Sequence, residues 1–144
     1  MKIWFDMDGT IADLYGVENW LGMLQDENPA PYAQAKPLVN LARLAKALNK
    51  AQAMGYEIGV ISWLSKTGSE NYNTAVTLAK VMWLAKHLPS VHWNVVKIVP
   101  YGTNKRWVCG DGILFDDEQR NRDQWGDGAY DPSEIFQILG AMKG

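Results

Sequence analysis

The chain has 144 residues, of which 14 are basic and 16 acidic, and its formal net charge is −2. This length fits one domain, which can bury roughly 68–70% of its unfolded surface. The charge offers no electrostatic case for binding nucleic acid or an anionic membrane. A single cysteine, Cys109, excludes an internal disulfide, and no signal peptide or long apolar run is present. We therefore expect one domain over residues 1–144, a cytoplasmic location and a small-molecule partner.

Four apolar runs predict strands, at residues 3–5, 56–62, 95–99 and 112–115. Leucine and alanine recur at helical spacing over 38–51, a second helix is predicted over 76–88, and a third begins after Asp131-Pro132-Ser133. This alternation predicts an α/β fold with a Rossmann-like, doubly wound parallel sheet and helices on both faces.

Residues 13–37 break the alternation. Tyr15, Trp20, Leu21 and Leu24 predict one short amphipathic helix, and Asn28-Pro29-Ala30-Pro31 predicts a loop. This segment, between the first predicted strand and the first long helix, could form only a helix and a loop.

Asp6-Met7-Asp8-Gly9-Thr10 places two carboxylates directly after the first predicted strand. Open α/β sheets bind ligands at the carboxyl ends of their strands. One carboxylate can act as a covalent nucleophile and a second as general acid and base, once Mg²⁺ has neutralised a phosphate. A calcium loop is the alternative, but Val17 stands where such a loop needs glutamate.

Leu114-Phe115-Asp116-Asp117 repeats the arrangement at the end of another predicted strand. Four acids and a phosphate need a cation besides Mg²⁺. We favour Lys105, which follows the third strand, over Lys97, whose position within 95–99 is typical of a solvated or edge residue.

Together these motifs resemble the haloacid dehalogenase superfamily in its phosphatase branch, over nearly the whole chain. The resemblance implies that Asp6 attacks phosphorus and that Asp8 protonates the leaving oxygen and later activates water. It implies that Ser62, at the end of the second strand, and Lys105 bind the phosphoryl group. Residues 13–37 would form a small cap over the site. An Mg²⁺ ion would be held by Asp6, the backbone carbonyl of Asp8, Asp117 and Asp116, with Asp117 placed first as ligand.

The eleven positions from Lys105 to Asp116, and the run Asp117-Glu118-Gln119-Arg120-Asn121 with the later Trp125-Gly126, look like the small nucleotidase branch, which includes 5'(3')-deoxyribonucleotidases. That likeness implies a mononucleotide substrate. Trp63 and Trp20 could stack on its base, whereas Trp4 and Trp107 are expected in the core. Five other polar residues could line the mouth of the site, although we favour surface or capping roles for each: Asp13, Glu18, Arg120, Asn121 and Arg122.

The sequence thus predicts an Mg²⁺-dependent phosphate monoester hydrolase that acts through an aspartyl-phosphate, with a mononucleotide as favoured substrate. Two alternatives stay open. One is a phosphatase for a larger substrate, such as a nucleic-acid end or a phosphoprotein. The other is a non-catalytic binding or regulatory domain with the same fold.

Overall fold

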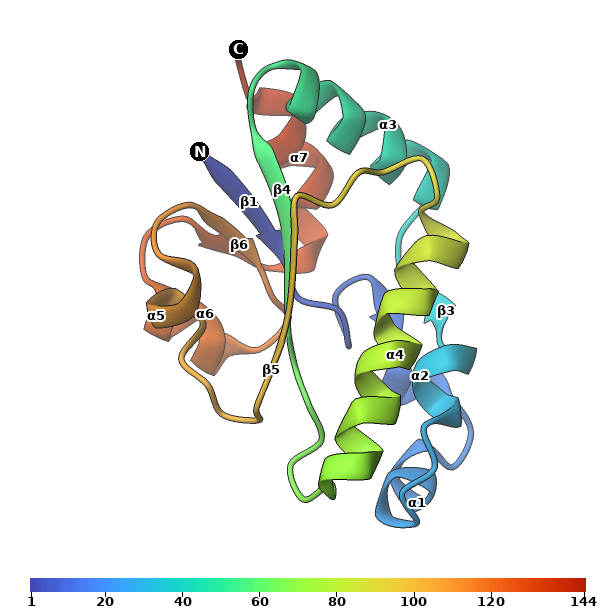
Figure 1. Cartoon of the computed structure of the whole chain (residues 1–144). Helices are drawn as coiled ribbons and strands as arrows, with labels where there is room; N and C mark the ends of the chain where they lie inside the picture. Colours follow the sequence, from blue (N-terminus) through green and yellow to red (C-terminus); the bar gives the residue numbers. More distant parts are fainter.

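The computed structural model describes residues 1–144 and has a parallel sheet of five strands at its centre (Figure 1). The strand order is β5-β4-β1-β6-β7, and every neighbouring pair is parallel. The strands are β1 (Lys2–Phe5), β4 (Glu57–Trp63), β5 (Val95–Val99), β6 (Ile113–Phe115) and β7 (Ala129–Tyr130). The first four confirm the predicted strands, while β7 is a two-residue strand that no apolar run marks.

Side chains of the central strand alternate between two hydrophobic layers. Ile3 and Phe5 pack with α3 (Leu41–Ala53), α4 (Glu70–His87) and α7 (Ile135–Ala141). Trp4 points to the other face and packs with α5 (Lys105–Cys109) and α6 (Gln119–Trp125). Figure 1 shows α5 and α6 on one side of the sheet and α3 and α4 on the other. The predicted doubly wound fold is therefore confirmed.

Trp4 is buried as predicted, but Trp107 is 86% exposed, so the prediction that Trp107 lies in the core is wrong. Helix α5 is a short surface helix whose inward positions are Lys105 and Val108. Trp107 follows Lys105 by two residues, about 200° around a helix of 3.6 residues per turn. Its ring therefore points to solvent.

The insertion after β1 forms a small cap. It contains β2 (Ala12–Asp13), a 3-10 turn (Leu14–Gly16), α1 (Trp20–Gln25), α2 (Ala30–Gln34) and β3 (Lys36–Pro37), and β2 pairs with β3 antiparallel at its base. Helix α1 confirms the predicted helix. The predicted loop at 28–31 is wrong in part, because α2 begins at Ala30; Pro31 is tolerated in its first turn, where no backbone N–H is needed.

The cap is fastened to the start of α4. The Glu27 carboxylate accepts hydrogen bonds from the backbone N–H of Ser69 at 3.0 Å and from its hydroxyl at 2.6 Å, and Tyr32 of α2 packs in a cluster with Tyr72 and Val76 of α4. None of the helices, those of the cap included, is both long and apolar enough to span a membrane.

Candidate active site

The turn after β1 carries Asp6 and Asp8 at the carboxyl edge of the sheet. The backbone N–H groups of residues 10–12 all donate to the carbonyl oxygen of Met7 at 3.0 Å, which reverses the chain directly after the strand. Gly9 has φ +81°, a conformation that favours glycine. This tight turn explains why Gly9 follows the two acids.

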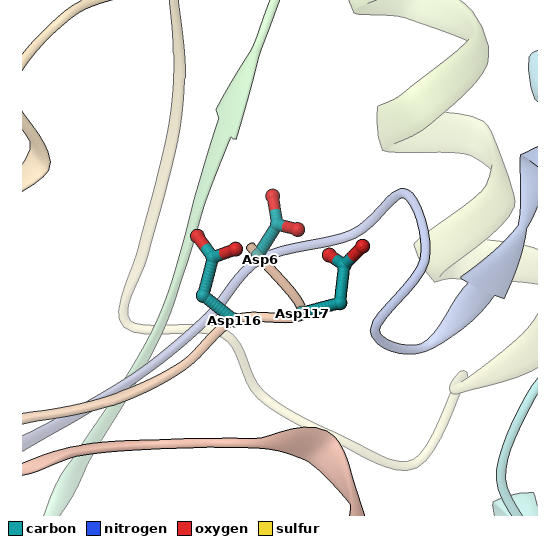
Figure 2. Close-up of side chains that lie close together, drawn as sticks. All are labelled: Asp6, Asp116 and Asp117. Atoms are coloured by element: carbon teal, nitrogen blue, oxygen red, sulfur yellow. The ribbon is translucent and has the colours of Figure 1, made fainter. Parts of the chain in front are cut away.

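Asp6, Asp116 and Asp117 bring their carboxylates together, with oxygen atoms within 4.8 Å of one another (Figure 2). A side chain at Gly9 would overlap the carboxylate of Asp117, so the glycine also leaves room for this acid. The hydroxyl oxygen of Thr10 lies 3.2 Å from Asp6 Oδ2 and 3.2 Å from Asp117 Oδ1, within reach to donate to either. The two strand ends therefore form one acidic cluster.

Lys105 is the cation of this cluster. It is 3% exposed, and its Nζ donates to Asp6 Oδ1 at 2.9 Å and to Asp116 Oδ2 at 2.7 Å. Burial works against the charged form, but Asp6 and Asp116 outweigh it and hold the pKa of Lys105 above its ordinary value. Lys97, the alternative, lies on the edge strand β5 and donates instead to the carbonyl oxygen of Val108.

One lysine does not neutralise the three acids. Burial, and then the charge of Asp6, raise the pKa of Asp116 to about 6 and that of Asp117 to about 8. Raised pKa values in neighbouring carboxyls mean that their negative charges repel one another in a poorly solvated site. A divalent cation would relieve this repulsion, and a set of carboxylate oxygens is the donor set that Mg²⁺ prefers.

The two acids after β6 differ in their remaining capacity to bind a metal. Asp116 Oδ2 accepts from Lys105 and from Asn121 Nδ2 at 3.1 Å, and its Oδ1 accepts from the Glu118 N–H at 2.9 Å. The Asp117 carboxylate meets one side-chain donor, the hydroxyl of Thr10. Asp117 therefore has the freer oxygen atoms.

Asp8 points away from this cluster toward a second buried lysine, Lys80 of α4. Lys80 Nζ donates to Asp8 Oδ2 at 2.9 Å and to Ser62 Oγ at 2.6 Å. Burial raises the pKa of Asp8, and the charge of Lys80 opposes that rise. Ser62 is fully buried, so the hydroxyl expected to meet a phosphoryl group lies beneath the site, next to Lys80.

A cavity of about 390 Å³ opens between the cap and the acidic cluster. Asp6, Asp8 and Lys105 line it, and both tryptophans predicted to contact substrate, Trp20 and Trp63, line it as well. Further aromatic and apolar walls come from Leu14, Tyr15, Leu21, Leu24, Tyr32, Leu64 and Tyr101. The cavity thus has both charged and aromatic side chains on its walls, and they lie close together: Lys105 Nζ is 5.4 Å from the centroid of the Trp63 ring.

Trp63 is held in place at this wall. Its Nε1 donates to the carbonyl oxygen of Thr103 at 2.9 Å, and its ring centroid lies 4.9 Å from that of Tyr101. The ring of Trp20, on the cap, packs edge to face against Tyr15, and the two ring centroids are 5.0 Å apart. The two tryptophans approach the cavity from different parts of the chain, one from the sheet and one from the cap.

Three residues at the site were not assigned to it from the sequence. Thr10 belongs to the first motif, and Lys80 was not singled out. Asn121, for which a surface or capping role is favoured over a place at the mouth of the site, is 4% exposed and bonds Asp116. Lys80 did leave a signal: it lies four residues after Val76 and three before Trp83, inside the apolar stripe of a helix. A lysine in that stripe must be paired where it is buried.

Comparison with known proteins supports the fold. No protein-family profile matches the chain, and no curated protein sequence matches it. Among solved structures it is similar to D,D-heptose 1,7-bisphosphate phosphatase from Burkholderia thailandensis, with a TM-score of 0.56 and 11% sequence identity. The match covers 98% of this chain and 99% of that one, so the shared fold includes almost every residue of both.

Proposed function

We propose that the protein is an Mg²⁺-dependent phosphate monoester hydrolase of the haloacid dehalogenase type that acts through an aspartyl-phosphate. The observation that carries the proposal is the position of Lys105, which bonds Asp6 and Asp116 at the floor of a cavity that Asp8 also lines. The structural neighbour is by name a phosphatase, which supports the same class of reaction.

In this mechanism Asp6 attacks phosphorus through a carboxylate oxygen, and the bond from phosphorus to the ester oxygen breaks. Asp8 gives its proton to that leaving oxygen. Asp8, now a carboxylate, then takes a proton from water as the water attacks the phosphorus. Phosphate leaves, Asp6 is a carboxylate again, and Asp8 is protonated for the next cycle.

Lys105 is proposed to bind the phosphoryl group. An ammonium has three N–H donors, and Lys105 uses two of them on Asp6 and Asp116, which leaves one for a phosphate oxygen in the cavity. Ser62 is also proposed as a phosphate ligand: its oxygen accepts from Lys80, so its hydroxyl hydrogen is still available. Because Ser62 is buried, its contact with phosphate requires a small shift at the end of β4.

The metal site is proposed at Asp6, Asp117, Asp116 and the backbone carbonyl of Asp8. Bound Mg²⁺ would neutralise phosphate charge and so let the Asp6 carboxylate approach. Asp117 is placed first as ligand, because its oxygens are freer than those of Asp116, which already accept three hydrogen bonds.

A mononucleotide is the favoured substrate class. The phosphate would lie beside Asp6, Asp8 and Lys105, and a planar base would meet Trp20 or Trp63, which line the same cavity. This assignment adds to the phosphatase proposal and can fail without it.

A panel of phosphate esters tests both levels. Phosphate release is measured from mononucleotides, sugar phosphates, 4-nitrophenyl phosphate and a 5'-phosphorylated oligonucleotide, each with Mg²⁺ and with excess chelator. We expect metal-dependent release, fastest from a mononucleotide. Release from no ester would contradict the phosphatase proposal, while a clear preference for sugar phosphates or the oligonucleotide would contradict only the nucleotide assignment.

A further inference from the structure

Lys80 is almost completely buried, with 1% of its surface exposed. Its Nζ donates three hydrogen bonds: to Asp8 Oδ2 at 2.9 Å, to Ser62 Oγ at 2.6 Å and to the backbone carbonyl of Trp63 at 2.8 Å. The ring of Tyr32, from the cap, lies 5.1 Å from the same nitrogen. All three N–H donors of the ammonium are therefore used within the protein.

Lys80 and Lys105 thus have different roles at one site. Lys105 lines the cavity and keeps a donor for a phosphate, whereas Lys80 does not line the cavity and has no donor left. Contact of Lys80 with substrate would require it to give up one of its present partners. Its geometry suits it to hold protein groups in place.

The group that Lys80 holds on the reaction side is Asp8. Of the two oxygens of Asp8, Oδ2 is bonded to Lys80, which leaves Oδ1 for a group in the cavity. The other two partners, Ser62 and Trp63, end strand β4, which is paired with β1 beside the turn that carries Asp8. Lys80 therefore links the carboxylate of Asp8 to the neighbouring strand, and its hydrogen bond to Oδ2 restricts how that carboxylate can rotate.

We propose that Lys80 is a positioning residue, which orients the Asp8 carboxyl so that Oδ1 faces the leaving oxygen of the substrate. The proposal rests on the proposed function, in which Asp8 is the general acid. Lys80 itself gives up no proton: the proton passes from Asp8 to the leaving oxygen as the bond to phosphorus breaks. A misplacement of about 1 Å can reduce a rate by about 10²-fold.

The role predicts a dependence on the leaving group. Phenyl phosphate and 4-nitrophenyl phosphate have nearly the same shape, but phenolate is the more basic leaving group and needs the proton more. The value of kcat/KM reports the steps up to the aspartyl-phosphate, where Asp8 acts as acid. In Lys80→Met we expect kcat/KM to fall about 10- to 100-fold for phenyl phosphate and less than about 3-fold for 4-nitrophenyl phosphate.

Three further variants make the experiment decisive. Lys86→Met, at an exposed position of the same helix, should leave both values unchanged. Asp8→Asn removes the acid, so adding Lys80→Met to it should change the ratio between the two substrates no further. Lys80→Gln replaces Lys80→Met if circular dichroism shows that the methionine variant does not fold, because glutamine keeps two donors but lacks the charge and reach of lysine.

The outcomes separate this proposal from the one on which it rests. Equal losses on the two substrates, no loss, or the same change of ratio in the Asp8→Asn background would overturn the positioning role of Lys80. The phosphatase proposal would still stand in those cases, provided that the wild-type protein hydrolyses both esters and Asp6→Asn hydrolyses neither. An inactive wild-type protein would overturn both proposals.

Discussion

Lys105 Nζ lies 2.9 Å from Asp6 Oδ1, although 99 positions separate the two residues in the chain. The parallel sheet brings them together, because Asp6 follows β1 at the centre and Lys105 begins the helix that follows β5 at the edge. The same lysine also bonds Asp116, so one buried cation links the carboxyl ends of β1 and β6. The other oxygen of Asp6, Oδ2, has only the Thr10 hydroxyl as a possible hydrogen-bond donor, so it is the less constrained of the two oxygens.

Replacing Asp6 with asparagine should abolish turnover and leave the fold intact. The amide has nearly the volume of the carboxylate, and its oxygen still accepts from Lys105, but it is a poor nucleophile. We expect kcat to fall by about three orders of magnitude or more. Phosphate release is measured on freshly purified protein, before deamidation can restore aspartate, and circular dichroism checks the fold.

The matched control is Asp123→Asn, which changes an exposed carboxylate on α6 and should leave kcat unchanged. Wild-type turnover in Asp6→Asn would rule out a covalent intermediate on this residue. A stable complex of the wild-type protein with fluoroberyllate, absent in the variant, would independently identify Asp6 as the attacking group.

Divalent metal should be required for activity, and Mg²⁺ should support it better than Ca²⁺. Calcium prefers longer bonds and more ligands, which would misplace the Asp6 carboxylate relative to phosphate. Asp117→Asn should raise the Mg²⁺ concentration that gives half-maximal activity by about 10-fold or more. Titrations of Mg²⁺ against phosphate release measure this, and full activity in excess chelator would exclude the proposed site.

The metal-free protein should lose stability as pH rises. A carboxyl with a raised pKa in the folded state binds its proton more tightly there than in the unfolded chain, where aspartate has a pKa of about 3.9. Its stabilising effect is complete below that value and is lost as pH rises through the folded pKa, which is about 6 for Asp116 and about 8 for Asp117. The melting temperature in chelator should therefore fall as the pH rises from about 4, the unfolded pKa, to about 8, the folded pKa of Asp117.

Bound Mg²⁺ favours the ionised carboxylates, so it should raise the melting temperature more at about pH 8 than at about pH 5. Asp117→Asn cannot ionise at this position, and it should show both a flatter pH dependence above about pH 6 and a smaller effect of Mg²⁺. Identical melting curves for wild type and variant across this range would contradict a buried, raised-pKa carboxyl at residue 117.

Local sequence patterns predicted the sheet well, because β1, β4, β5 and β6 each coincide with an apolar run, and β1 and β6 end directly before paired acids. The same strand ends indicated Asp6, Asp8, Asp116 and Asp117, since parallel strands bring their carboxyl ends to one edge. Patterns failed where burial depends on the tertiary fold. Trp107 is apolar yet exposed on a surface helix, and β7 is two residues long.

Lys80 shows the same limit from the polar side. Nothing near it in the sequence resembles a motif, and its partners Asp8, Ser62 and Trp63 come from two other elements. Only the packing of α4 against the sheet and the cap buries it, so its pairing became visible with the tertiary structure. Its place among the buried residues of α4 is the one local sign in the sequence that this lysine is paired.

Trp20 and Trp63 should govern the choice of substrate, because they are the two tryptophans that line the cavity, whereas Asp6, Asp8 and Lys105 are proposed to meet the phosphate. Trp20→Ala should reduce kcat/KM for a mononucleotide more than for 4-nitrophenyl phosphate. Stacking of a base on an aromatic side chain contributes about 1–3 kcal/mol, so the extra loss should be about 5- to 150-fold. Trp107→Ala, an exposed tryptophan that does not line the cavity, is the matched control and should change neither substrate.

Trp63 needs two variants, because its indole both lines the cavity and donates to the Thr103 carbonyl. Trp63→Phe keeps an aromatic surface and loses only the donor, whereas Trp63→Ala loses both. If stacking on the base is the role of Trp63, the phenylalanine variant should keep most of the preference for the mononucleotide and the alanine variant should lose it. Equal losses on both substrates in both variants would mean that Trp63 is a packing residue beside Tyr101, and the nucleotide assignment would then depend on Trp20 alone.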